Sequence, residues 1–135
     1  MAATYLNGNN SGDAFGATVA SAGDVDANGL SDVIVGAWNY SVFESNESAA
    51  FIFRADSFLP GILSRSAAEA ATRIESNEAG NGFISVGSAG DVNGDGYSDV
   101  VVGWPDYGGQ ETPERSWFSL EAHQGVPTPA RHLST

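Results

Sequence analysis

The chain has 135 residues, which is room for one ordinary domain or for two small repeat units. Seventeen acidic residues against five basic ones give a formal net charge of −12. This charge argues against nucleic acid or an anionic membrane as a partner, because clustered Lys and Arg side chains are what bind phosphate groups. Cysteine is absent, which excludes disulfides and thiolate metal sites.

The first 12 residues are interpreted as a lead-in to the first structural unit. They contain neither a basic segment nor an apolar stretch, so an export signal of the parent protein is expected to lie outside this chain. No run reaches the roughly 18 apolar residues that a membrane span needs. Tyr5 and Leu6 are expected to form an outer strand for the last sheet of a neighbouring chain.

Glycine-rich turns between β-branched and aromatic runs predict an all-β chain. Four strands are expected in a first unit, residues 13–79, and a partial second unit, residues 80–120, repeats the first two. The predicted strands lie at about 14–20, 31–37, 49–54, 72–75, 83–88 and 98–104. Residues 64–71 have helical propensity without an apolar stripe, which predicts a loop with at most one helical turn.

Ten residues occur twice with nearly the same pattern, at 23–32 and 90–99. We call residues 24–32 the first loop and residues 91–99 the second loop. Side chains that carry oxygen stand at loop positions 1, 3, 5 and 9, and position 7 offers a backbone carbonyl. Calcium takes six to eight oxygen ligands, which such a loop supplies when its short side chains converge. The candidate metal ligands are Asp24, Asp26, Asn28, Leu30 (carbonyl), Asp32, Asp91, Asn93, Asp95, Tyr97 (carbonyl) and Asp99.

Other interpretations of the two loops are weaker. An EF-hand needs a bidentate Glu at position 12, where this chain has Val35 and Val102, and a dockerin-like loop fails for lack of flanking helices. Magnesium fits less well than calcium because it demands octahedral geometry. A turn rich in Asn and Asp that binds nothing is the remaining alternative. It is disfavoured because three converging carboxylates would repel one another in each loop.

The strand residues beside the first loop strengthen the calcium interpretation. Phe15-Gly16-Ala17-Thr18-Val19-Ala20, the loop itself and Val35-Gly36-Ala37 together resemble the FG-GAP repeat of integrin α-subunit β-propellers and their bacterial relatives. The resemblance covers about residues 7–107. It implies four-stranded antiparallel blades, a ring that usually has seven blades, and two calcium ions held by the ligands named above.

The second copy departs from this pattern before its first strand. Phe83 precedes Val86 by three positions, whereas Phe15 precedes Val19 by four, which predicts a shifted strand or a bulge. Two units do not close a propeller, so we expect either a fragment or self-association through open blade faces.

Residues after about 110 no longer follow the pattern, which calls for an apolar third strand. Read one step out of frame, the usual codons for these residues allow a largely aliphatic run with an obligatory Val between Trp117 and Phe118, followed by small residues. We hypothesise a shift of reading frame near residues 110–114, which sequencing of the parent DNA would test. The alternative is a divergent edge strand. Residues 121–135 are expected to be irregular.

The predicted function is that of a calcium-binding, non-catalytic propeller module in adhesion, scaffolding or protein interaction. The alternatives are a carbohydrate-binding, lectin-like module and an accessory module of a secreted hydrolase. An enzyme is disfavoured because the acidic residues occupy metal positions and no nucleophile and base pair up; His123 and His132 stand alone in the tail. Trp38, Trp104 and Trp117 are expected to be packing residues. The family resemblance places the protein outside the cell or on its surface.

Overall fold

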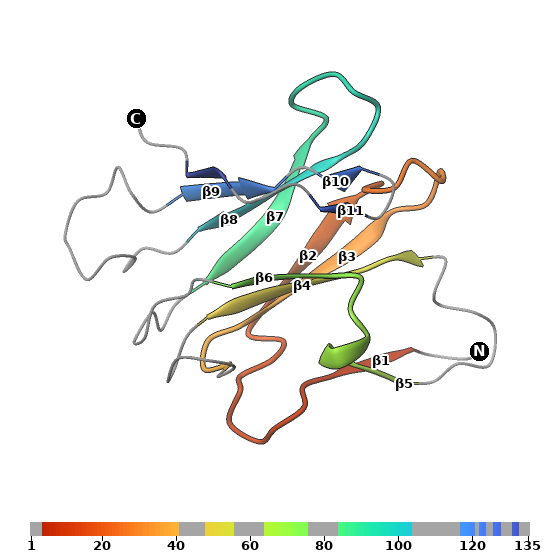
Figure 1. Ribbon diagram of the computed structural model, residues 1–135. Helices are drawn as coiled ribbons and strands as arrows, with labels where there is room; N and C mark the ends of the chain where they lie inside the picture. The colour runs from red at the N-terminus through yellow and green to blue at the C-terminus, as the bar shows by residue number, and fades with distance from the viewer. Residues whose placement is uncertain are drawn as a thin grey trace.

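The computed structural model describes residues 4–40, 48–55, 64–75 and 84–103, together with the backbone of four short strands between 117 and 132 (Figure 1). Apart from one 3-10 turn, η2, every regular element in this part of the chain is a strand, which confirms the all-β class. The elements are β1 (Tyr5–Asn7), β2 (Thr18–Gly23), β3 (Asp32–Ala37), β4 (Ala49–Phe53), β5 (Ser64–Ser66), η2 (Ala67–Glu69), β6 (Thr72–Glu75), β7 (Ser85–Gly90), β8 (Asp99–Gly103), β9 (Trp117–Leu120), β10 (Ala122–His123), β11 (Val126–Pro127) and β12 (Arg131–His132).

Two four-stranded antiparallel sheets lie side by side in Figure 1, and the remaining described strands form two small sheets, β1 with β5 and β10 with β11. The first sheet has the order β2-β3-β4-β6, so each strand pairs with the next long strand along the chain. The second sheet has the order β7-β8-β9-β12, and β2 lies against β7. Short strands rich in β-branched and aromatic residues favour this arrangement.

The strand predicted at residues 14–20, β2, begins and ends later than its sequence predicts. β2 starts at Thr18, because Ala14 and Gly16 have φ angles of 53° and 91°, in the left-handed region that a strand does not use. The second unit shows no shift in its ladder: Val86 pairs with Val102 as Val19 pairs with Val35. Both hairpins carry their irregularity at the loop end, where β2 and β7 finish. Phe83, on which the expected shift depended, lies outside the described residues.

The main core lies between the two sheets. The first sheet contributes the even-numbered face of β3 and β4, whereas the second contributes the face of β8 that corresponds to odd-numbered positions of β3. The sheets therefore meet through unlike faces. The buried residues of this core are Ala22, Val25, Ile34, Ala50, Ile52, Ile74, Ile84, Val100 and Val102.

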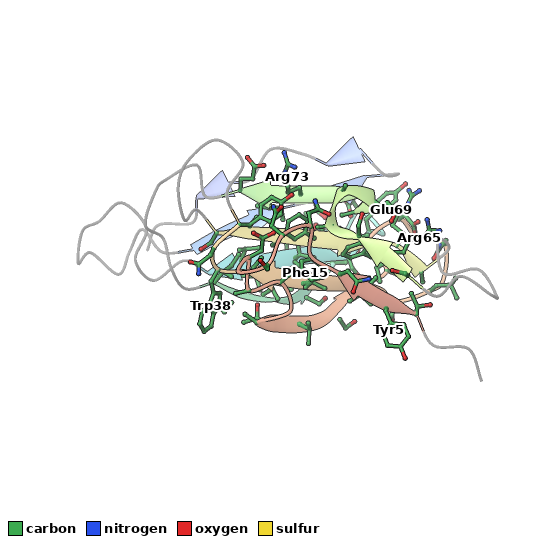
Figure 2. All side chains as sticks on the ribbon, turned by 90° about the horizontal axis from the view of Figure 1, so that it is seen from below. Tyr5, Phe15, Trp38, Arg65, Glu69 and Arg73 are labelled. Carbon is green, nitrogen blue, oxygen red and sulfur yellow. The ribbon has the colours of Figure 1, made fainter. Side chains whose placement is uncertain are left out.

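The opposite face of the first sheet is covered by the chain itself. The Phe15 ring lies 5.5 Å, centroid to centroid, from the Phe51 ring at a tilt of 56°, and it meets the Phe53 ring edge-on at 6.2 Å. Figure 2 shows Phe15 within the body of the molecule and Tyr5 projecting from it. Gly8 is required there, because a Cβ on it would come within 2.8 Å of the Phe15 Cβ. This second core consists of Val35, Ala37, Tyr40, Ala49, Phe51, Phe53 and Ala67, with Leu6, Phe15, Val33 and Ala70 packed against it.

Two expectations are corrected here. β1 does not wait for a neighbouring chain: it pairs in parallel with β5 of the same chain, and the Asn7 amide donates to Ser64 Oγ at 2.7 Å. Residues 64–71, expected to be a loop with at most one helical turn, contain that turn as η2 and, in addition, the unexpected strand β5. We call residues 4–16 and 64–70 the cap. The cap covers a face that was expected to remain open.

The third strand of the second unit is present at the position that the repeat predicts. β9 pairs with β8 in the register of β4 with β3, so Phe118 stands opposite Val102 as Phe51 stands opposite Val35. The second sheet is still not a copy of the first. Its outer strand, β12, has two residues and comes from the segment expected to be irregular, where β10 and β11 also pair.

Candidate metal centre

Both loops close the hairpin between the first two strands of a sheet. The first loop follows β2 and the second follows β7, each after the irregularity at the strand end. Positive φ angles at Ala27, Gly29, Gly94 and Gly96 allow each loop to turn back on itself within a few residues. The backbone N–H groups consequently point toward the centre of the loop, where the acidic side chains meet them.

In the first loop, backbone amides hold the side-chain oxygens in place. The carboxylate of Asp24 accepts hydrogen bonds from the N–H of Asn28 at 3.0 Å and of Gly29 at 2.7 Å. Asn28 also donates its N–H to Asp26 Oδ1 at 3.3 Å, and its side-chain oxygen accepts from the Leu30 N–H at 2.8 Å. These contacts orient three oxygen-bearing side chains of the loop toward its interior.

Asp32 anchors the end of the first loop to two separate parts of the chain. Its Oδ2 accepts the N–H of Val25 at 2.8 Å, and its Oδ1 accepts the N–H of Ala55, just after β4, at 2.8 Å. The residue is 1% exposed. A buried carboxylate needs such donors, because burying an unpaired charge is costly.

Three carboxylates converge in the first loop. Oxygens of Asp24, Asp26 and Asp32 all lie within 4.8 Å of one another. Like charges at this distance repel, and the amide donors offset that repulsion only in part. The donor set consists of hard oxygens, which is the chemistry that calcium prefers, so these residues fit a calcium ion.

The electrostatics of Asp26 reflect this crowding. Burial raises the pKa of its carboxyl above 3.8, the ordinary value, and the charge of Asp32 raises it further. The Asn28 N–H and Arg54 act in the opposite direction. The Arg54 Nε lies 3.7 Å from Asp26 Oδ2, and its side chain is 34% exposed, so solvent screens the pair.

The second loop repeats the amide pattern. The carboxylate of Asp91 accepts from the N–H of Asp95 at 3.0 Å and of Gly96 at 2.8 Å, and Asp99 Oδ2 accepts from the Val92 N–H at 2.8 Å. Its three carboxylates occupy positions 1, 5 and 9, because position 3 is Asn93. Among the described residues, a convergence of three acidic side chains within 4.8 Å is found in the first loop.

Comparison with known families settles what kind of repeat this is. The family model of the FG-GAP repeat matches residues 83–114, a stretch that contains the whole second loop. This stretch is similar to the FG-GAP repeat. The recognition made from the sequence is thereby confirmed for the second unit, and the first unit shares its loop pattern and hydrogen bonds. A comparison with curated proteins gave no match.

The match to the FG-GAP repeat supports a propeller-type repeat in the second unit and leaves the ligand set a prediction. The structure brings Asp24, Asp26 and Asp32 together. The carbonyls of Leu30 and Tyr97 remain predicted ligands, and the second set remains a prediction as a whole. Within the described residues, no helix is long and apolar enough to cross a bilayer.

Three contacts of the first loop, with Arg54, Ala55 and Ser98, are not predicted by the sequence. Arg54 and Ala55 reach the first loop because β4 pairs with β3 in a register that ends at Phe53, and the next two residues then lie beside Asp32. Ser98 reaches it from the second unit. The register of β3 with β4 would have identified the first two, whereas Ser98 depends on how the sheets pack.

Proposed function

We propose that this protein is a calcium-binding, non-catalytic module of the FG-GAP propeller type. The convergence of Asp24, Asp26 and Asp32 within 4.8 Å is the observation that carries the proposal. Calcium offsets the mutual repulsion of these carboxylates and cross-links the two ends of the loop to the end of β4. In a chain without cysteine, such an ion takes the place that disulfides have in many secreted domains.

The proposed role is adhesion or scaffolding through protein interaction, outside the cell or at its surface. The family match supports a module that assembles with other blades and not one that performs chemistry. The net charge of −12 suits a soluble, cation-rich setting and opposes binding to anionic surfaces. Self-association through the sheet faces that lie beyond the cap is part of the proposal.

Calorimetric titration of the full chain with calcium tests the ion. We expect two bound ions, and we expect Asp24→Asn and Asp91→Asn each to abolish one of them. Each variant keeps one acceptor oxygen and replaces the other with an NH2 group, so it loses the charge together with one hydrogen bond from a loop amide. Magnesium serves as the control cation and should bind more weakly. If calcium releases no heat at millimolar concentration and leaves the melting temperature unchanged, the proposal is wrong.

Removal of the ion tests its structural role. A ligand present at a hundred times its Kd stabilises the folded state by about 2.7 kcal/mol, so chelation should lower the melting temperature clearly. Light scattering with and without chelator measures association at the same time. We expect the ion-free chain to associate more readily, since its loops hold the sheets less firmly. A chelated chain that stays monomeric and equally stable would contradict both expectations.

The lectin-like alternative needs an aromatic platform for a sugar ring. Trp38 is 37% exposed and not fully packed as expected, and Tyr5 is 63% exposed. Figure 2 shows these two residues at opposite ends of the body, so they do not form one platform. Binding on a glycan array would restore this alternative, and the full parent gene would decide whether the module accompanies a hydrolase.

A further inference from the structure

The two loops are equal in composition and unequal in surroundings. Each has three Asp and one Asn at its ligand positions. Position 2 of the first loop is Val25, which is 3% exposed and packs in the core between the sheets. The same position of the second loop is Val92, which is 62% exposed. The first loop is therefore anchored in the core through Val25, whereas the corresponding side chain of the second loop is exposed to solvent.

The second unit also holds the first loop through its backbone. The N–H of Ser98, the residue before β8, donates to the carbonyl of Asp24 at 2.9 Å. Asp24 is the first candidate ligand of the first loop, so this hydrogen bond fixes the start of that loop. Among the described residues, no equivalent backbone hydrogen bond reaches the carbonyl of Asp91.

The glycines before the two loops show the same difference. Gly23 and Gly90 have nearly equal φ angles, 70° and 73°. A Cβ on Gly23 would lie 2.6 Å from Ser98 Oγ and 2.7 Å from Ser98 Cβ. A Cβ on Gly90 would have no atom of the described residues within 4 Å. The first loop is thus in close contact with the second unit, while the corresponding side of the second loop is open.

We infer that the second unit completes the calcium loop of the first, so that the first loop binds calcium more tightly than the second and its ion strengthens the contact between the two sheets. The inference rests on the proposed calcium function. A loop whose backbone is already fixed loses less conformational freedom when it takes up an ion. The coupling is reciprocal: if contact between the two units strengthens calcium binding in the first loop, then bound calcium strengthens the contact between the units by the same free energy.

Arg54 should weaken calcium binding in the first loop, because its positive charge lies close to Asp26. Its side chain is one-third exposed and the Nε lies 3.7 Å from the carboxylate, so the opposing effect is small. Three features favour binding in the first loop: the buried Val25, the Ser98 hydrogen bond and the close contact at Gly23. The first loop is accordingly expected to bind calcium about tenfold more tightly than the second, a difference of about 1.4 kcal/mol.

The two glycines provide a matched pair of variants. Gly23→Ala and Gly90→Ala introduce the same backbone strain at nearly the same φ, but only the first pushes a methyl group into Ser98. Calorimetry on the full chain, with Asp24→Asn and Asp91→Asn assigning the sites, measures both affinities. We expect Gly23→Ala to weaken the first site several-fold more than Gly90→Ala weakens the second. Thermal unfolding at saturating calcium shows whether each variant is folded.

A second measurement leaves the contact between the units intact. Ser98 belongs to the second loop, so the test uses the Asp91→Asn variant, in which that loop is expected to bind no ion. Amide hydrogen exchange at Ser98 should slow in this variant when calcium fills the first loop, because the Ser98 N–H donates to the carbonyl of Asp24. Two sites of equal affinity, equal effects of the two glycine substitutions, or an unchanged Ser98 amide would overturn the inference and leave the calcium function standing. Absence of calcium binding would overturn both.

Discussion

Asp26 is ionised at neutral pH against the preference of its surroundings. Burial and the nearby charge of Asp32 raise its pKa, so the folded state disfavours the ionised carboxylate. In the ion-free protein this cost is absent below pH 3.8 and develops as the pH rises above that value. A bound calcium ion would reverse the preference, because the ionised carboxylate would then be a ligand.

The effect of Asp26→Asn on stability should therefore be favourable without calcium and unfavourable with it. In chelator at pH 7 it removes the repulsion with Asp32 and should raise the melting temperature by about 2–4 °C. In saturating calcium it removes a charged ligand and should weaken first-loop binding by about tenfold. Thermal unfolding with and without calcium gives both values. Asn93 is the natural counterpart at this position of the second loop.

Equal destabilisation in chelator and in calcium would show that Asp26 acts through packing alone. The loss of the Arg54 contact accompanies this substitution, but that pair is partly exposed and contributes little. The reverse substitution in the second loop, Asn93→Asp, is the matched control. It should destabilise the ion-free protein and tighten calcium binding.

At the scale of single elements, η2 depends on one carboxylate. Glu69 Oε2 accepts the N–H of Ser66 at 2.8 Å, and this hydrogen bond lowers the pKa of Glu69 below 4.5, with a smaller contribution from Arg65. A lowered pKa means that the stabilisation is present above the unfolded-state value and is lost as the pH falls through the folded-state value. The contribution is small because the side chain is exposed.

Glu69→Gln should accordingly destabilise the protein slightly at pH 7 and have no effect near pH 3. Thermal unfolding of both proteins in chelator, at the two pH values, isolates the effect from calcium binding. Because the comparison is made between variant and parent at each pH, other carboxylates cancel. An effect of the same size at both pH values would mean that the charge of Glu69 is irrelevant to η2.

Phe15 fixes the cap to the first sheet through its contacts with Phe51 and Phe53. Phe15→Ala removes a partly buried ring and should cost about 2–3 kcal/mol, below the usual range for fully buried Phe. Hydrogen exchange should accelerate in β1 and β5, whose pairing spans three residues each. Phe15→Leu, which retains bulk, is the control and should lose much less. Unchanged exchange in β1 would show that the cap does not depend on this ring.

The strands of the two hairpins were predictable because their β-branched and aromatic runs are long and lie next to turn residues. β3 and β8 appear almost where expected, as does β6. A strand at Tyr5 and Leu6 was expected, but its pairing with β5 was not predictable, since the pairing joins three-residue segments far apart in the chain and residues 64–66 show no strand pattern. In the candidate site, spacing identified the ligands in the loops, but Arg54 and Ser98 reach them only through tertiary packing.

At the scale of the whole molecule, the cap determines which surface is available for association. Removing residues 1–16 would expose the aromatic face of the first sheet, including Phe51 and Phe53, both of which are 1% exposed or less. Exposed apolar faces of this kind drive association. The shortened chain should therefore form larger species than the full chain in light scattering at saturating calcium. Removal of residues 1–3 alone is the control, and equal scattering by both shortened chains would contradict the protective role of the cap.

The two sheets meet through unlike faces, which gives the molecule a direction. The even-numbered side of the first sheet packs on the opposite side of the second, so the contact is head-to-tail and is not made by a two-fold axis. Further units could therefore be added beyond the second sheet, whereas the cap covers the outer face of the first sheet. A duplicated 67-residue segment inserted between the units would then fit as an additional layer, with its own Val25 buried and its own serine placed behind the loop before it.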